Sequence, residues 1–136
     1  MTQQVRQVTT IPASLDDVWA VVGDVGNVAD WVPALEASRL EGDVRHARFA
    51  GGGDATERIV SRDDENRTYT YAYLQGPLAL ASYESTLTVG GRDGAAEVEW
   101  SAEFAAEDPT TEAELSTAID GIYAAGLASL LTRFGG

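Results

Sequence analysis

The residues with the clearest chemical potential are tyrosines that recur at every second position. Tyr69, Tyr71 and Tyr73 have this spacing, which places all three on one face if the segment is a β-strand. Tyr83 belongs to the next apolar segment and can join them. Buried phenols need hydrogen-bond partners, which a ligand carbonyl or hydroxyl could supply, and a phenol can act as a general acid toward an enolising carbonyl. Ordinary packing of tyrosine in a strand explains the same spacing.

A carboxylate and a cation precede these tyrosines. By alternation Glu57 shares a strand face with Ile59, and Arg45 shares one with Phe49. A carboxylate that is partly desolvated in a cavity holds its proton more tightly and can serve as a base. Arg45 could pair with Glu57 or with a ligand oxygen, whereas plain surface exposure is the alternative for Glu57. We predict Glu57 and Tyr71 as catalytic residues.

Further candidates are aromatic or lie on the last long apolar segment. Trp31 and Trp100 could each line a cavity, and Ile119 and Tyr123 fall on one face of the segment that ends the chain. The complete set of predicted ligand-binding residues is Tyr69, Tyr73, Tyr83, Trp31, Trp100, Arg45, Phe49, Ile119 and Tyr123.

Composition limits the classes of function. The chain has 136 residues, of which 44% are hydrophobic, as expected for a single globular domain over residues 1–136. Its net charge of −13 repels nucleic acid and anionic lipid. With no cysteine and one histidine, thiolate and histidine-rich metal sites are excluded, and we expect neither metal nor cofactor.

Localisation follows from the apolar segments. The first residues contain no apolar stretch typical of a signal peptide, and no uninterrupted apolar run approaches the ~20 residues of a membrane span. We therefore expect a cytoplasmic protein without membrane insertion, either a monomer or a homodimer.

The longest predicted element is a helix over residues 110–134. Its apolar side chains recur in steps of three and four, Thr110 or Thr111 can cap its start, and Arg133 and Gly135 are typical of its end. Two short helices are predicted over 14–22 and 24–31. Strands are predicted over residues 3–11, 35–41, 44–50, 55–62, 68–74, 81–89 and 97–104.

The last predicted strand, residues 97–104, indicates which face of the sheet is buried. Val98, Trp100, Ala102 and Phe104 alternate with polar residues, which indicates one buried and one solvated face and so an antiparallel sheet. Such a twisted sheet can wrap the apolar face of the final helix.

The order of elements and several short motifs resemble bacterial members of the START and pollen-allergen superfamily, also called SRPBCC or polyketide cyclase/dehydrase-like proteins. The motifs are Ile11-Pro12-Ala13-Ser14, Asp30-Trp31-Val32-Pro33, Tyr69-x-Tyr71, Gly76-Pro77-Leu78 and Val98-Glu99-Trp100. The resemblance implies an α+β helix-grip fold, in which a seven-stranded curved antiparallel sheet wraps around a long C-terminal helix, with two short helices between the first two strands. It also implies an internal cavity for a hydrophobic or aromatic small molecule.

Three functions remain compatible with the sequence. The first is a polyketide cyclase or aromatase-like enzyme in which tyrosine hydroxyls and Glu57 move protons. The second is a non-catalytic carrier or sensor that stores a lipid or another small molecule in the same cavity. The third is an interaction module whose cavity is filled by its own side chains.

Overall fold

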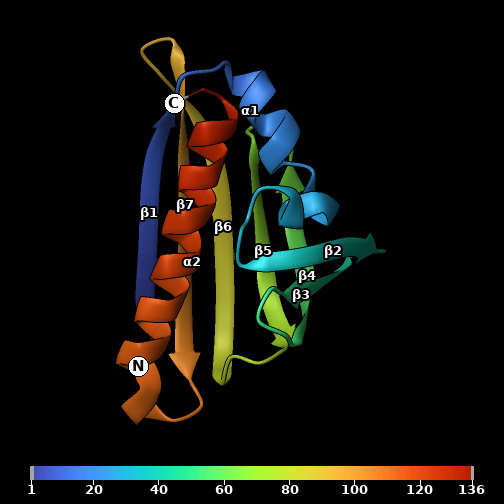
Figure 1. Cartoon of the computed structure of the whole chain (residues 1–136), viewed down its shortest axis with the longest axis vertical. Helices are drawn as coiled ribbons and strands as arrows, with labels where there is room; N and C mark the ends of the chain where they lie inside the picture. The colour runs from blue at the N-terminus through green and yellow to red at the C-terminus, as the bar shows by residue number, and fades with distance from the viewer. Residues whose placement is uncertain (1, 136) are drawn as a thin grey trace.

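A seven-stranded antiparallel sheet forms one layer of the molecule, and one long helix lies across it (Figure 1). The computed structural model describes residues 2–135. The sheet order is β1-β7-β6-β5-β4-β3-β2, so the first strand pairs with the last. This arrangement confirms the predicted helix-grip fold. The strands are β1 (Gln3–Ile11), β2 (Leu35–Glu41), β3 (Val44–Phe49), β4 (Asp54–Asp63), β5 (Thr68–Gln75), β6 (Leu80–Arg92) and β7 (Ala95–Ala106).

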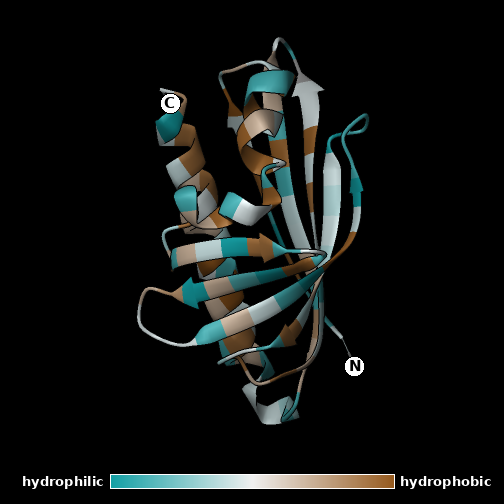
Figure 2. Cartoon of the chain, turned by 90° about the vertical axis from the view of Figure 1, so that its right-hand side faces the viewer, coloured by the Kyte–Doolittle hydropathy of each residue, from teal (hydrophilic) through white to brown (hydrophobic). Residues whose placement is uncertain are grey.

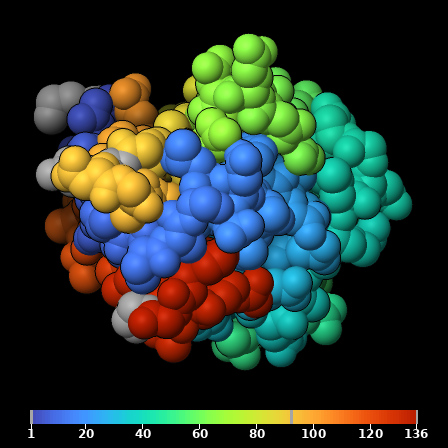
Figure 3. All heavy atoms as spheres, turned by 90° about the horizontal axis from the view of Figure 1, so that it is seen from above, coloured from blue at the N-terminus to red at the C-terminus, as the bar shows by residue number. Residues whose placement is uncertain are grey.

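Both predicted short helices lie between β1 and β2. The first is α1 (Leu15–Val22), where the Ser14 hydroxyl accepts a hydrogen bond from the Asp17 amide at 3.1 Å and so satisfies a free helix N–H. The second, η1 (Val25–Asp30), is a 3₁₀ helix. Figure 3 shows α1, in blue, covering one end of the molecule between the end of the C-terminal helix and two strand turns.

The β6–β7 hairpin is longer than predicted. The two predicted strands end at residue 89 and begin at residue 97, but Gly90 pairs with Glu97 and Gly91 with Ala96. The turn therefore narrows to Asp93 and Gly94, which adopt positive φ angles of 48° and 81°. Pairing with β7 overrides the weak strand preference of two glycines.

The C-terminal helix α2 (Glu112–Arg133) follows a short 3₁₀ turn, η2 (Pro109–Thr111). The predicted cap was wrong. Thr111 makes no side-chain capping bond, and Asp108 instead accepts from the Thr110 amide at 3.0 Å. The extra 3₁₀ turn starts the helical backbone at Pro109, so Asp108 precedes the first turn and satisfies one of its free amides.

One face of α2 packs against the sheet. Its buried residues are Leu115, Ile119, Tyr123, Gly126, Leu127 and Leu130. In Figure 2 apolar residues recur along the helix. By length and composition alone, residues Pro109–Arg133 could cross a membrane. In the fold this segment is the core helix of the sheet, which accounts for its apolar composition.

The two edge strands of the sheet, β1 and β2, have different neighbours. At the β1 edge, the side-chain amides of Gln3 and Gln7 donate to Glu112 and Asp120 of α2 at 3.0 and 2.7 Å. The β2 edge carries the exposed side chains of Glu36, Arg39 and Glu41. The helix α2 therefore covers β1. At the β2 edge η1 packs near Ser38, whose hydroxyl donates to the Gly26 carbonyl and accepts from the Ala29 amide, and the charged side chains of β2 face solvent.

Candidate functional site

An arginine and a glutamate face each other on the inner side of β3 and β4. Arg45 and Glu57 are direct cross-strand partners, and Arg45 Nε donates to Glu57 Oε1 at 2.8 Å. Only 1% of Arg45 is exposed, and 15% of the Glu57 side chain. A charge buried this deeply is stable only with several partners. The predicted pairing of these two residues is thus present in the fold.

Arg45 is held by further groups on two sides. Its Nη1 donates to the Val25 carbonyl at 3.0 Å and to the Tyr69 hydroxyl at 3.2 Å. Its guanidinium carbon lies 4.5 Å from the centroid of the Tyr71 ring, a cation–π distance. Burial favours loss of the arginine proton, but Tyr69, Glu57 and Tyr71 outweigh that effect and raise the Arg45 pKa. The side chain is therefore a permanent cation.

Four hydroxyl groups form a chain beside this pair. The Tyr71 and Tyr83 hydroxyls are 3.2 Å apart, Tyr83 contacts the Tyr123 hydroxyl, and Tyr123 lies 2.8 Å from Ser85 Oγ. Trp100 Nε1 donates to Ser85 Oγ at 3.0 Å. The chain joins β5, β6 and α2, so it couples the sheet to the helix.

Burial keeps these phenols protonated. It raises the pKa of Tyr71 to about 12, with the nearby Glu57 carboxylate as the next cause. Burial also raises the pKa values of Tyr83 and Tyr123 well above the ordinary value for a phenol. At neutral pH each of the three oxygens carries one hydrogen that it can donate within the chain.

Trp100 fixes the position of the chain against the helix. Its ring stacks on Tyr123 at a centroid distance of 4.0 Å and an interplanar angle of 9°. A Cβ added at Gly126 would lie 3.0 Å from Trp100 Cζ3 and 3.4 Å from Trp31 Cζ3. The indoles therefore approach α2 so closely at Gly126 that a side chain there would press on them.

A pocket of about 60 Å³ lies between the inner face of the sheet and α2. Nine of the eleven predicted site residues line it: Arg45, Phe49, Glu57, Tyr71, Tyr73, Tyr83, Trp100, Ile119 and Tyr123. Its remaining lining is Val28, Val32, Leu35, Ala47, Ala55, Leu78, Leu80 and Ile122. The polar groups are thus enclosed by a mostly apolar wall.

The other two predicted residues lie outside this lining. Tyr69 is fully buried and contacts Arg45 from behind. Trp31 packs against Trp100 at a ring distance of 5.3 Å, and its Nε1 has no hydrogen-bond partner within residues 2–135. Both residues contact side chains that line the pocket, Arg45 and Trp100, without lining it themselves. This supporting position could not be predicted from the strand or helix face on which each residue lies.

Sequence reasoning did not place Ser85 in the site. This serine is 1% exposed and lies where Tyr123, Trp100 and the Ser101 carbonyl meet. Its inward direction follows from alternation with Tyr83, but serine is common in strands. Leu78, Leu80 and Ile122 were also missed, because a loop residue, the first residue of β6 and a helix residue come together only in the tertiary fold.

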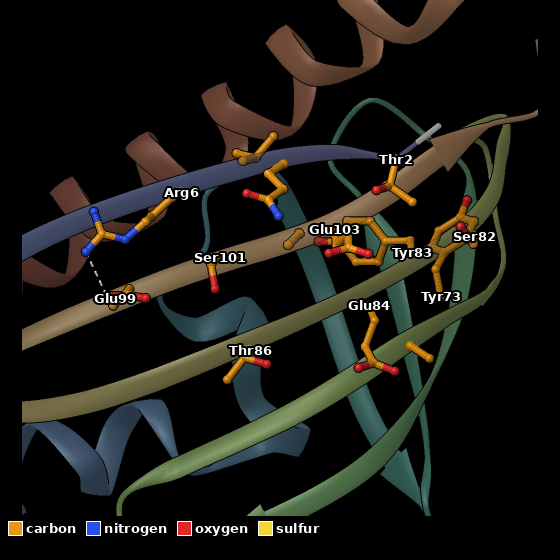
Figure 4. A pocket seen from close by; sticks show the side chains of 14 residues that line it. Thr2, Arg6, Tyr73, Ser82, Tyr83, Glu84, Thr86, Glu99, Ser101 and Glu103 are labelled. Atoms are coloured by element: carbon orange, nitrogen blue, oxygen red, sulfur yellow. Dashed lines mark hydrogen bonds and ion pairs between the residues drawn. The ribbon is translucent and has the colours of Figure 1, made fainter. Parts of the chain in front are cut away.

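A wider hollow of about 770 Å³ lies on the outer face of the sheet (Figure 4). Glu84 and Glu103 face each other directly across β6 and β7 there, and Arg6 pairs with Glu99 at 2.9 Å. Within residues 2–135, no group of three or more His, Cys, Asp or Glu side chains could hold a metal ion. The outer hollow is a solvated acidic surface, as the alternating strand pattern indicated.

Several solved structures are similar to this chain along nearly its whole length. An uncharacterised protein from Bacillus thuringiensis is 30% identical, with a TM-score of 0.90, over 97% of this chain and 98% of that one. The protein XoxI from Bacillus cereus is 31% identical, with a TM-score of 0.90, over 96% and 94%. The ZhuI aromatase/cyclase from Streptomyces sp. R1128 is 20% identical, with a TM-score of 0.86, over 98% and 93%.

Sequence comparison gives the family. A search of curated proteins found no match. Residues 2–135 match the family described as "Polyketide cyclase / dehydrase and lipid transport". The match spans nearly the whole chain and agrees with the curved sheet, the two short helices and the long C-terminal helix. The chain therefore belongs to the polyketide cyclase/dehydrase and lipid transport family.

Proposed function

We propose that this protein binds a small hydrophobic or aromatic molecule in the pocket between the sheet and α2, and that it acts on the molecule as a polyketide cyclase or aromatase does. The observation that carries the proposal is the buried Arg45–Glu57 pair at the polar end of an otherwise apolar pocket. Ligand pockets are typically apolar with a few convergent polar groups that orient the ligand.

Two atoms of the pair are available to a ligand. The hydrogen bonds of Arg45 within residues 2–135 use Nε and Nη1, so its Nη2 hydrogens have no protein acceptor there. Glu57 Oε1 accepts from Arg45, and within the same residues Oε2 has no donor. A ligand carbonyl can accept from Nη2 while Oε2 receives a ligand proton. This is the arrangement that enolisation of a ketone requires.

The proposed reaction is an intramolecular aldol addition. Glu57 removes a proton from a methylene group between two carbonyls, and the enolate carbon attacks a carbonyl further along the same ligand. The alkoxide formed takes a proton from Tyr71, a pocket-lining phenol whose pKa burial raises to about 12. The proton that Glu57 removed then returns through solvent to the Tyr71 phenolate, so both groups regain their starting forms. The apolar wall holds the ligand folded, which supplies the entropic part of catalysis.

A second function, a non-catalytic carrier, has its own supporting observation. The hydroxyls of Tyr71, Tyr83 and Tyr123 are already bonded to one another or to Ser85. A pocket with such internally satisfied groups can hold a ligand by apolar contact alone. Carrier and enzyme then differ in whether Glu57 and Tyr71 are needed for turnover.

Binding requires the pocket to expand. About 60 Å³ holds a few water molecules, and ligand pockets typically measure ~300–1,000 Å³. The connection between β5 and β6, which includes Leu78, and the start of β6 at Leu80 both contribute to the wall. This connection lies at the end of the sheet opposite α1 (Figure 1). Its movement is the simplest way to admit an aromatic ring.

Binding is tested with the neutral fluorescent probe N-phenyl-1-naphthylamine. The Ala47→Leu variant fills the pocket, because Ala47 is buried and lines it. Ala72→Leu is the matched control on the outer face of β5. We expect the pocket variant to weaken probe binding at least ~10-fold and the control to change it less than ~2-fold. Equal affinities, or no binding to the unmodified protein, would contradict the proposal.

Enzyme and carrier are separated with a cyclisable poly-β-ketone. Glu57→Gln and Tyr71→Phe should retain affinity for this substrate and lose turnover by ~100-fold or more if proton transfer is catalysed. The carrier is supported instead if the unmodified protein binds the ketone without converting it.

A further inference from the structure

The hydroxyl chain has a defined direction, which begins at Ser85. Ser85 Oγ lies 2.9 Å from the Ser101 carbonyl oxygen, and a carbonyl can only accept a hydrogen bond. The single Ser85 hydrogen is therefore directed at Ser101. Because Trp100 Nε1 also donates to Ser85 Oγ, at 3.0 Å, the serine oxygen is left with one acceptor position, which faces Tyr123.

The same count of donors and acceptors fixes the direction of each phenol hydrogen bond. Tyr123 lies 2.8 Å from Ser85 Oγ and must donate to it. Its hydrogen is then used, so Tyr83 donates to Tyr123, and Tyr71 in turn donates to Tyr83 across 3.2 Å. The three hydrogens all point along the chain towards Ser101. The Tyr71 oxygen also accepts from Trp100 Nε1 at 3.3 Å. What remains for a ligand at the Tyr71 and Tyr83 oxygens that line the pocket is lone pairs, not hydrogens.

We propose, resting on the proposed ligand pocket, that Ser85 is a positioning residue that makes this pocket select ligands carrying a hydroxyl hydrogen at the phenol end, as in a phenol or an enol. A ligand with only ether or carbonyl oxygens at that point meets two acceptors and cannot form a hydrogen bond. An alkoxide formed during reaction is a much stronger acceptor and can draw the Tyr71 hydrogen away from Tyr83.

Two naphthalene derivatives test this selection. 1-Naphthol and 1-methoxynaphthalene share a ring system and an oxygen, but only the first can donate. Each is titrated as a competitor of N-phenyl-1-naphthylamine at neutral pH. We expect 1-naphthol to bind the unmodified protein ~10-fold more tightly, the effect of one hydrogen bond to a buried acceptor.

Removal of the Ser85 hydroxyl should relax the preference. In Ser85→Ala, Tyr123 loses its fixed acceptor, the chain can reverse, and Tyr71 or Tyr83 can donate to the ether oxygen. We expect the affinity for 1-methoxynaphthalene to rise about 3-fold or more and that for 1-naphthol to change less than ~2-fold. A variant that only damages the pocket would weaken both. Ser85→Thr keeps the hydroxyl and should restore the preference.

Two further variants complete the experiment. Ser101→Ala keeps the carbonyl and removes only a hydroxyl on the outer face, so the preference should persist. Tyr123→Phe removes the next hydroxyl of the chain and should relax the preference for 1-naphthol as Ser85→Ala does. It therefore provides the test if Ser85→Ala does not fold. Equal binding of both compounds to the unmodified protein overturns this inference and leaves the ligand pocket standing. Binding of neither overturns both.

Discussion

Arg45 and Glu57 lie opposite each other on adjacent strands, with Nε and Oε1 2.8 Å apart on the inner face of the sheet. The pair would be costly if either charge were left alone, because little water reaches it. Its retention in the middle of the pocket wall fits a site that must bind polar atoms of a ligand as well as its apolar body.

Loss of one member of this pair should be more costly than loss of both. We expect Arg45→Met to lower the free energy of unfolding by ~3–5 kcal/mol and the double variant Arg45→Met/Glu57→Met to recover part of that loss. Arg6→Met breaks the outer Arg6–Glu99 pair, whose side chains are 62% and 40% exposed, and should cost less than ~1 kcal/mol. Urea unfolding measures all three. Similar losses for Arg45→Met and Arg6→Met would contradict the buried-pair argument.

Two glycines of α2 should respond in opposite directions to substitution by alanine. A Cβ at Gly121 meets nothing within 4 Å, so Gly121→Ala should stabilise the protein by ~0.5–1 kcal/mol through helix propensity. A Cβ at Gly126 meets Trp100 at 3.0 Å, and the stacking on Tyr123 holds that indole in place.

At Gly126 the destabilisation caused by overpacking should therefore exceed the stabilisation that alanine gives through its higher helix propensity. We expect Gly126→Ala to destabilise the protein by ~1–2 kcal/mol and to change the near-ultraviolet circular dichroism of the tryptophans. Thermal unfolding of both variants gives the comparison, with Gly121→Ala as the matched control. A stabilised Gly126→Ala protein would show that the indoles can move.

The buried phenols predict a loss of stability at alkaline pH. The pKa of Tyr71 is raised by burial from 10.0 to about 12, so the folded state holds this proton more tightly than the unfolded chain. The stabilisation is complete below pH 10 and is lost as the pH rises from 10 through about 12. Tyr71→Phe should reduce the slope there by up to ~1.4 kcal/mol per pH unit.

The alkaline prediction has a direct spectroscopic check. Phenolate absorbance should appear together with the loss of the far-ultraviolet circular dichroism signal, because the phenols ionise on unfolding. The pKa values of Tyr83 and Tyr123 are also raised by burial, so they should behave in the same way. Phenolate formation well before unfolding would contradict their burial.

The connection between β5 and β6 should open more easily without one hydrogen bond. The Leu78 amide donates to the Tyr73 hydroxyl at 3.0 Å, and both residues line the pocket. We expect Tyr73→Phe to speed hydrogen exchange of the Leu78 amide by ~5-fold or more and to speed binding and release of N-phenyl-1-naphthylamine. Tyr73→Phe with unchanged exchange would show that the connection is held by other contacts.

Most of the fold could be predicted from the sequence because the spacing of the apolar residues matches the faces that are buried in the structure. The alternation around Val98 and Trp100 and the helical spacing from Leu115 to Leu130 each correspond to a buried face. The errors arose where pairing or geometry beyond the segment decided the result. Gly90 was expected in a turn but pairs in the hairpin, and Asp108 replaced Thr111 as the cap.

The site was predictable to the extent that it depends on strand faces. Tyr71, Arg45 and Glu57 alternate inward, and their strands lie side by side in the order that a simple meander gives. Ser85 could not be identified, because its role depends on the register of β6 against β7 and on the rotation of α2. The supporting position of Trp31 could not be predicted either, because its contact with Trp100 is made only in the folded chain.

The unequal edges of the sheet have a consequence for self-association. Unpaired strand edges recruit further strands and begin aggregation, and charged side chains oppose this. With β1 tied to α2 by Gln3 and Gln7, the other edge strand is β2, which η1 covers only in part. Glu36, Arg39 and Glu41 place charges of both signs along it. Their joint replacement by valine would turn that edge into a template for filament growth.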